Sequence, residues 1–148
     1  MIEVRELRYG DLDAVGSLLG QLGEVTSTGS PIEDRSVHKT YELMVRFPDV
    51  YRNYVAVQHS RVVGLISLVF YKTLLHEGGT ALINELVVSG SERGRGIGTQ
   101  LIKAGIAAAR ECGMEEIEVG TESGNRDARR FYKHIGFNLE YVLFGMEF

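Results

Sequence analysis

Apolar residues in the first part of the chain follow strand spacing and then helix spacing. Residues 2–7 alternate between apolar and polar side chains, which predicts a strand. Asp11 stands where a helix N-cap belongs, because apolar residues recur after it on one helical face. Residues 26–31 are typical of a loop. A second helix is predicted from about residue 32 to residue 47, where a proline follows.

The remaining pattern alternates strands and helices around a glycine-rich loop. Residues 53–72 predict two strands joined by a short turn near His59, Ser60 and Arg61, and residues 80–90 predict another strand. An alanine-rich helix follows the glycines and ends near Cys112, with Gly113 placed as a left-handed cap. The last predicted elements are a strand at 115–122, a helix at 125–136 and one or two strands within 137–148.

This order of elements defines the expected fold class. A strand, a glycine loop, a helix and a second strand imply a parallel pair joined by a right-handed crossover. Antiparallel hairpins precede that crossover. The sequence therefore predicts a mixed α/β (α+β) fold, and 148 residues suit one domain covering residues 1–148.

Composition narrows the classes of function. Hydrophobic residues make up 44% of the chain and charged residues 24%, as in globular proteins, and no apolar run has the length of a membrane span. The first fifteen residues carry early acids and are not expected to be a signal peptide. A net charge of −4 argues against a nucleic-acid partner, and the single cysteine suits a cytoplasmic protein.

The glycine-rich loop is the candidate ligand site. Gly94, Gly96 and Gly98 let a ligand approach backbone N–H groups, and the helix that follows adds free donors at its N-terminus. Neighbouring Arg93 and Arg95 add charged donors. The loop lacks the Lys of a P-loop, and Thr99 stands where the dinucleotide fingerprint needs its third glycine. Spacing alone leaves two interpretations, a phosphate site or a tight turn that binds nothing.

Residues 93–98, "RGRGIG", match the Q/R-x-x-G-x-G/A signature of the GNAT superfamily of acetyl-CoA-dependent N-acetyltransferases, which this chain resembles. "ELVV" before the loop is similar to that family's fourth strand. Residues 123–137 resemble a later family segment, with Asn125, Tyr132, Gly136 and Phe137 in the matching positions. The resemblance covers most of the chain from about residue 54. The first 50 residues fit loosely, as the strand and two helices that line the acceptor side.

The resemblance implies a fold and a coenzyme site. A single GNAT-like domain would have a mixed sheet of six to seven strands, a bulged and splayed parallel pair, and about four helices. The backbone of Leu86, Val87 and Val88 would bind the pantetheine arm of acetyl-CoA, and Asn125 would bind it too or serve as a helix N-cap. The diphosphate would be bound by the amides and side chains of Arg93, Gly94, Arg95, Gly96, Ile97, Gly98 and Thr99.

The implied reaction is direct attack of a primary amine on the acetyl thioester in a ternary complex. Tyr132 would protonate the departing thiolate, or else is an aromatic core residue. The amide of Val87 or Val88 would stabilise the oxyanion. Glu85 is the first candidate for the general base. The alternatives are Glu118 and Glu122, and each of these carboxylates has a solvated or ion-paired role as its competing interpretation. His76 and Glu77 sit in a loop from which they could reach the acceptor.

Several predictions remain open among alternatives. Four His residues and one Cys show no metal-ligand spacing, so no metal is expected. The acceptor is a small-molecule amine, an aminoglycoside, a polyamine, an amino acid, or a protein N-terminus or lysine. An acidic pocket including Glu24, Asp34 or Glu42 would indicate a polycation. A different class of function is a non-catalytic module that senses acetyl-CoA or acts through a partner.

The last eight residues predict a partner of the same kind. "YVLFGMEF", residues 141–148, is apolar on both alternating faces around Val142, Leu143 and Phe144. A half-exposed terminal strand would need only one apolar face. The segment is therefore either buried on both sides within one chain or paired across a homodimer, and we expect the homodimer.

Overall fold

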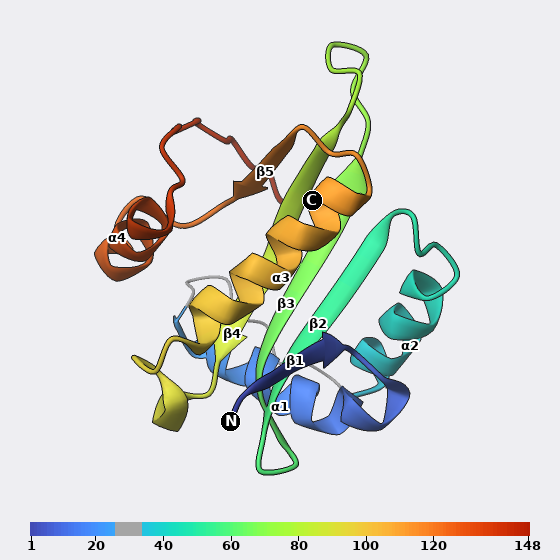
Figure 1. The fold of residues 1–148 in the computed structure, drawn as a ribbon, viewed down its shortest axis with the longest axis vertical. Helices are drawn as coiled ribbons and strands as arrows, with labels where there is room; N and C mark the ends of the chain where they lie inside the picture. Colours follow the sequence, from blue (N-terminus) through green and yellow to red (C-terminus); the bar gives the residue numbers. More distant parts are fainter. Residues whose placement is uncertain (26–33) are drawn as a thin grey trace.

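The computed structural model describes residues 1–25 and 34–148, and within them five strands form one sheet in the order β1-β2-β3-β4-β5 (Figure 1). The strands are β1 (Glu3–Glu6), β2 (Tyr51–Gln58), β3 (Arg61–Tyr71), β4 (Thr80–Val88) and β5 (Glu116–Val119). The helices are α1 (Leu12–Val25), α2 (Asp34–Met44), α3 (Ile97–Glu111) and α4 (Arg126–Ile135), with short 3-10 turns η1 (Tyr9–Asp11) and η2 (Gly90–Glu92). The mixed α/β class is confirmed.

Strand pairing follows the predicted order. Neighbours from β1 to β4 are antiparallel, and β4 pairs with β5 in parallel after the crossover through α3. The predicted turn between β2 and β3 is confirmed, since His59 and Ser60 have φ angles of 48° and 61°. Two consecutive left-handed residues match the twist of a tight hairpin. The long β3–β4 hairpin projects beyond the other strands in Figure 1.

Helices cover the two faces of the sheet unequally. α3 crosses the front face in Figure 1, where Leu101 and Ile102 join a core with Ile66 and Leu68 of β3. Gly105 allows this close contact, because a Cβ there would lie 3.1 Å from Ile66 Cδ1. α1 packs on the opposite face through a smaller cluster made of Val15, Leu18, Val55, Leu65 and Val87. The β-strand residues that face α1 are therefore on the side away from α3.

The predicted count of six to seven strands is wrong for the described residues, which form five. The one or two strands expected in residues 137–148 are absent, and this segment has no regular structure. An alternating apolar pattern favours an extended backbone, but a strand also needs a neighbouring edge with which to exchange hydrogen bonds. Val142, Leu143 and Phe144 are 81%, 92% and 91% exposed, so they are not buried within one chain.

Candidate active site

β4 changes its pairing with both neighbours near residue 84. In β3, Ser67 pairs with Glu85 of β4, but the next β3 residue, Leu68, pairs with Ile83. Asn84 is therefore an extra residue in β4, and the strand is bulged there. On the other side, parallel pairing with β5 ends at Ile83 and Val119. The rest of β4 therefore continues without β5 beside it. The expected bulge in β4 is present, and the side of β4 that β5 leaves open is a place where a ligand can bind backbone groups.

Alternation along β4 shows which amides face this open side. The amide of Ser89 donates to the carbonyl of Val63 at 2.9 Å, so it points toward β3. Backbone groups on an extended strand alternate in direction, so the amide of Val87 also points toward β3. The amides of Leu86 and Val88 then point toward the gap left by β5. The side chains of Leu86 and Val88 pack against the α3 core, as expected of strand residues.

The glycine loop presents an open backbone at the start of α3. Gly94 and Gly96 have φ angles of 75° and 78°, and a Cβ at either would meet no atom within 4 Å. The first α3 backbone bond runs from Gln100 N to Gly96 O at 3.1 Å, so the amides of residues 97–99 precede the helical ladder. These donors, together with the positive end of the helix, suit an anionic group such as a diphosphate.

Both arginines of the loop have protein partners. Arg93 Nε donates to the carbonyl of Val88 at 3.2 Å, which ties the loop to the end of β4. Arg95 forms an ion pair with Glu92, whose side chain is only 12% exposed. A diphosphate bound by the loop would compete with Glu92 for Arg95, while the Arg93 side chain keeps further N–H donors.

Gly98 has a packing role that the sequence did not reveal. A Cβ at Gly98 would lie 3.1 Å from the Phe131 ring, so α4 rests on the first turn of α3. Asn125 begins α4, where its Oδ1 accepts from Ala128 N at 3.1 Å, and the predicted N-cap is confirmed. Its amide NH2 remains as a donor for a ligand. The contact through Phe131 brings α4 beside the glycine loop.

Tyr132 lies in an aromatic group on α4. Its ring centroid is 5.4 Å from that of Phe131 and 5.6 Å from that of Phe137, and the residue is partly buried. Burial raises the pKa of the Tyr132 phenol above its usual value. The phenol is therefore protonated at neutral pH, as a proton donor must be. The ring contacts agree with the interpretation of Tyr132 as a core residue, and its role as a proton donor stays a prediction.

Glu85 is the partly buried carboxylate beside the bulge. Burial raises its pKa, and a hydrogen bond from Ser67 acts in the opposite direction. Glu118 accepts from the Tyr71 hydroxyl at 2.9 Å, and Glu122 is exposed. Sequence reasoning missed Ser67 and Tyr71, because cross-strand register brings them to these carboxylates and no local motif marks it.

The other acidic and basic candidates lie apart from this group. His76 and Glu77 are exposed in the β3–β4 hairpin loop, where His76 Nδ1 lies 4.0 Å from a Glu115 oxygen. Glu42 is exposed on α2. The side chains of Glu24 and Asp34 lie outside the described residues, so the expected acidic pocket stays a prediction.

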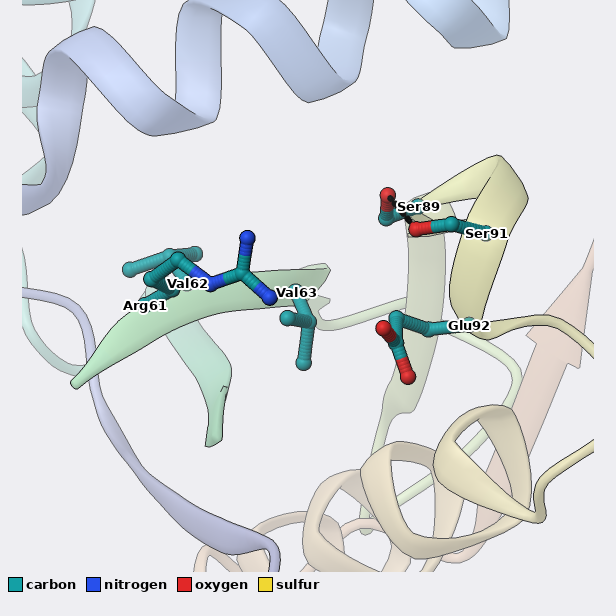
Figure 2. A pocket seen from close by; sticks show the side chains of 6 residues that line it. All are labelled: Arg61, Val62, Val63, Ser89, Ser91 and Glu92. Carbon is teal, nitrogen blue, oxygen red and sulfur yellow. Dashed lines mark hydrogen bonds between the residues drawn. The ribbon is translucent and has the colours of Figure 1, made fainter. Parts of the chain in front are cut away.

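A surface hollow lies next to the glycine loop. Figure 2 shows the side chains that line it. The Arg61 guanidinium extends toward Glu92, and the hydroxyls of Ser89 and Ser91 lie close together. It is formed where β3 begins and β4 ends. The hollow therefore borders the loop that would bind an anion, while the carboxylate and amide candidates lie further along β4.

Comparison with known proteins gives a consistent result. The sequence profile of the acetyltransferase (GNAT) family matches residues 24–137. The chain belongs to this family. Aminoalkylphosphonate N-acetyltransferase of Salmonella typhimurium is 30% identical over 142 residues, covering 96% of this chain and 88% of the relative. N-alpha-acetyltransferase 30 of Schizosaccharomyces pombe is 33% identical over 87 residues, covering 57% of this chain and 56% of the relative.

Solved structures show the same fold. A protein from Bacillus halodurans described as a transcriptional regulator has a TM-score of 0.88 at 26% identity, with both chains covered completely. Glucosamine-6-phosphate N-acetyltransferase from Arabidopsis thaliana has a TM-score of 0.85 at 20% identity, covering 100% of this chain and 99% of that one. Family membership and the curated relatives together make this GNAT protein an acetyl-CoA-dependent N-acetyltransferase.

In the described residues of this acetyltransferase, no group of three or more His, Cys, Asp or Glu side chains is arranged to hold a metal ion. Among the same residues, no helix combines the length and apolar character needed to cross a membrane.

Proposed function

We propose that this chain transfers an acetyl group from acetyl-CoA directly to a primary amine in a ternary complex at the β4–β5 gap. The observation that carries the proposal is the combination of an Asn84 bulge, the end of β5 pairing at Ile83, and an open glycine loop at the end of the same strand. Together they leave backbone donors along one continuous path from β4 to α3.

The residues present fit acetyl-CoA. The amides of the first α3 turn would bind its diphosphate, which can come close to the backbone because Gly94 and Gly96 have no Cβ atoms. Arg93 and Arg95 would add positive charge. The open side of β4 from Leu86 to Val88 would hold the pantetheine arm, assisted by the Asn125 amide. Bound there, acetyl-CoA supplies an activated acetyl thioester.

The chain's own groups move the protons. Glu85 accepts the proton of the attacking amine, because only a neutral amine is a nucleophile. Of the two candidate oxyanion donors, the amide of Val88 faces the gap and that of Val87 faces β3, so Val88 is assigned the role. Tyr132 gives its proton to the departing sulfur, which its burial-raised pKa supports by keeping the phenol protonated.

The acceptor is proposed from the relatives, which differ in what their names say they acetylate. The Salmonella relative covers nearly the whole chain, so aminoalkylphosphonates are the first acceptors to test. Aminoglycosides, polyamines, amino acids and peptides with a free N-terminus or lysine complete the set. The reaction is assigned to the cytoplasm, since the chain has a single cysteine and uses acetyl-CoA.

A coenzyme-release assay with this set of amines tests the proposal. We expect acetyl-CoA to bind in calorimetry and at least one amine to release free thiol, with intersecting initial-velocity plots as for a ternary complex. Binding without release by any amine would instead favour the non-catalytic acetyl-CoA module.

The exposed end of the chain supports a homodimer. Residues 142–144 expose large apolar side chains, although Tyr141 donates to Glu116 of β5 at 3.0 Å and keeps the segment near the sheet edge. We assign this segment to contact with a second copy. Light scattering at micromolar concentration is expected to give twice the monomer mass, and a purely monomeric sample would contradict the assignment.

A further inference from the structure

Ser67 occupies an unusual position for a small polar side chain. It lies in the middle of β3 and is only 4% exposed. Leu65, two residues earlier, belongs to the cluster under α1, so Ser67 shares that face of the sheet. A buried hydroxyl in a strand loses water and needs a hydrogen-bond partner.

Glu85 lies directly across from Ser67, and the bulge in β4 puts it there. Ser67 pairs with Glu85 in the register of β3 and β4, and Asn84 is the extra residue directly beside this pair. Without the extra residue, the β4 side chains on one side of the bulge would point to the opposite face of the sheet, because side chains alternate along a strand. Val87 confirms the face, since it packs in the α1 cluster two residues after Glu85.

We propose that Ser67 is a positioning residue, which holds Glu85 in place and favours its ionised form by donating a hydrogen bond from its hydroxyl to the Glu85 carboxylate. This inference rests on the proposed role of Glu85 as the base. Burial raises the pKa of Glu85, and the Ser67 hydrogen bond lowers it. A base must be deprotonated when the amine arrives, so Ser67 keeps Glu85 functional at lower pH.

Among the side chains that the structure describes, no charged neighbour replaces this effect. Burial and Ser67 are the influences that shift the Glu85 pKa. Glu118 and Glu116 of β5 are bonded to Tyr71 and Tyr141, and Asp13 of α1 lies beside His38. The remaining charged side chains described on elements packed against β4 are exposed, namely Arg61 of β3 and Lys103, Arg110 and Glu111 of α3.

The test combines a direct pKa measurement with kinetics in the full chain. In Ser67→Ala, carbon NMR of the Glu85 carboxyl should show a raised pKa, and the acid limb of the kcat/KM profile should move to higher pH with it. On the acid limb, at pH values below the Glu85 pKa of both proteins, activity should fall about threefold to tenfold, the effect of one lost hydrogen bond, while the high-pH plateau stays unchanged. Ser67→Thr keeps the hydroxyl and should restore the profile.

Thr80→Val is the matched control, because Thr80 is also a buried hydroxyl on this face, 2% exposed, but lies beyond the bulge. It should leave the Glu85 pKa and the acid limb unaltered. If Ser67→Ala does not fold, Ser67→Cys keeps the size with a weaker donor. A Glu85 pKa that does not move in the serine variants overturns the positioning role.

A pKa that moves while the acid limb stays fixed overturns the catalytic part of the inference. It shows that Ser67 acts on Glu85 but that Glu85 is not the base. Failure of the acetyl transfer itself would appear separately, as no thiol release by the wild-type chain with any amine.

Discussion

The two sides of β4 offer a ligand different kinds of groups. Toward α3 and α4, the candidate coenzyme site consists mainly of backbone groups, exposed by glycines at residues 94 and 96 and by the gap beside β5. Toward α1, the candidate acceptor site consists of side chains, with Glu85 and Ser67 at its centre. Backbone recognition requires glycines at fixed spacing, so it leaves a motif in the sequence. Side-chain recognition depends on cross-strand register and leaves none.

The largest expected effect comes from closing the backbone site. Gly96→Asp adds bulk and a negative charge where the diphosphate would meet the α3 amides, in space that is now open. Acetyl-CoA affinity should fall by more than about 100-fold, since the introduced carboxylate would face the like-charged diphosphate in a desolvated contact. Calorimetry measures it, with circular dichroism to show that the fold persists.

Gly113→Asp is the control for backbone strain. Gly113 ends the same helix with a φ angle of 73°, and a Cβ there also meets nothing within 4 Å. It should cost similar stability and leave acetyl-CoA affinity intact. Equal losses of affinity in the two variants would mean that strain, and not the phosphate site, explains the result.

The next largest effect is expected from a change at Glu85, on the side of β4 where side chains form the candidate site. Glu85→Gln keeps the shape but removes the proton acceptor, so kcat should fall about 100- to 1,000-fold with little change in acetyl-CoA affinity. In the wild-type chain, activity should decline as pH falls through the Glu85 pKa, which burial raises, and Gln should abolish this limb. Glu118→Gln, the alternative base, should keep it. The reverse result would transfer the role to Glu118.

A smaller effect is expected from removing the hydroxyl of Tyr132 on α4. Tyr132→Phe keeps the aromatic packing with Phe131 and Phe137 and removes only the hydroxyl. Because a thiolate is already a tolerable leaving group, kcat should fall about 10- to 100-fold, and acetyl-CoA affinity by less than about tenfold. The high-pH limb of the profile should disappear. Tyr54→Phe is the control, since burial raises the pKa of this β2 tyrosine too. A wild-type rate in Tyr132→Phe would leave Tyr132 as a packing residue.

The same contrast explains what the sequence could predict. The hairpin turn at His59 and the caps at Gly113 and Asn125 depend on residues close in the chain, and the parallel pair follows from the order strand, helix, strand; each is present. A bulge in β4 was expected only through the family resemblance, which did not place it at Asn84, and the Ser67–Glu85 pair was not expected at all. Both depend on which strands meet, which local pattern does not determine. The prediction of strands in residues 137–148 was wrong for the same reason, because a strand needs a neighbouring strand with which to form hydrogen bonds.

The smallest expected effect on activity concerns the ion pair between Arg5 of β1 and Asp11 of η1. We expect this pair to stabilise the fold and to take no part in the reaction. Asp11 accepts from Arg5 of β1 at 2.8 and 2.9 Å and from the Arg8 amide at 2.9 Å, and it is buried. These hydrogen bonds, above all that from Arg5, lower the pKa of Asp11. Asp11→Asn should reduce the free energy of unfolding by about 1–3 kcal/mol at neutral pH, the usual loss for a charged hydrogen bond.

The pH dependence separates this role from catalysis. A carboxylate with a lowered pKa stabilises the folded state above its unfolded value of about 3.9, and this stabilisation is lost as pH falls through the folded pKa. The difference in unfolding free energy between wild type and Asp11→Asn should therefore be constant near neutrality and shrink below about pH 4. Asp13→Asn, whose side chain is 92% exposed in the same turn, should cost much less. Both variants should keep wild-type kcat, and a rate lost in Asp11→Asn alone would place Asp11 in the acceptor site.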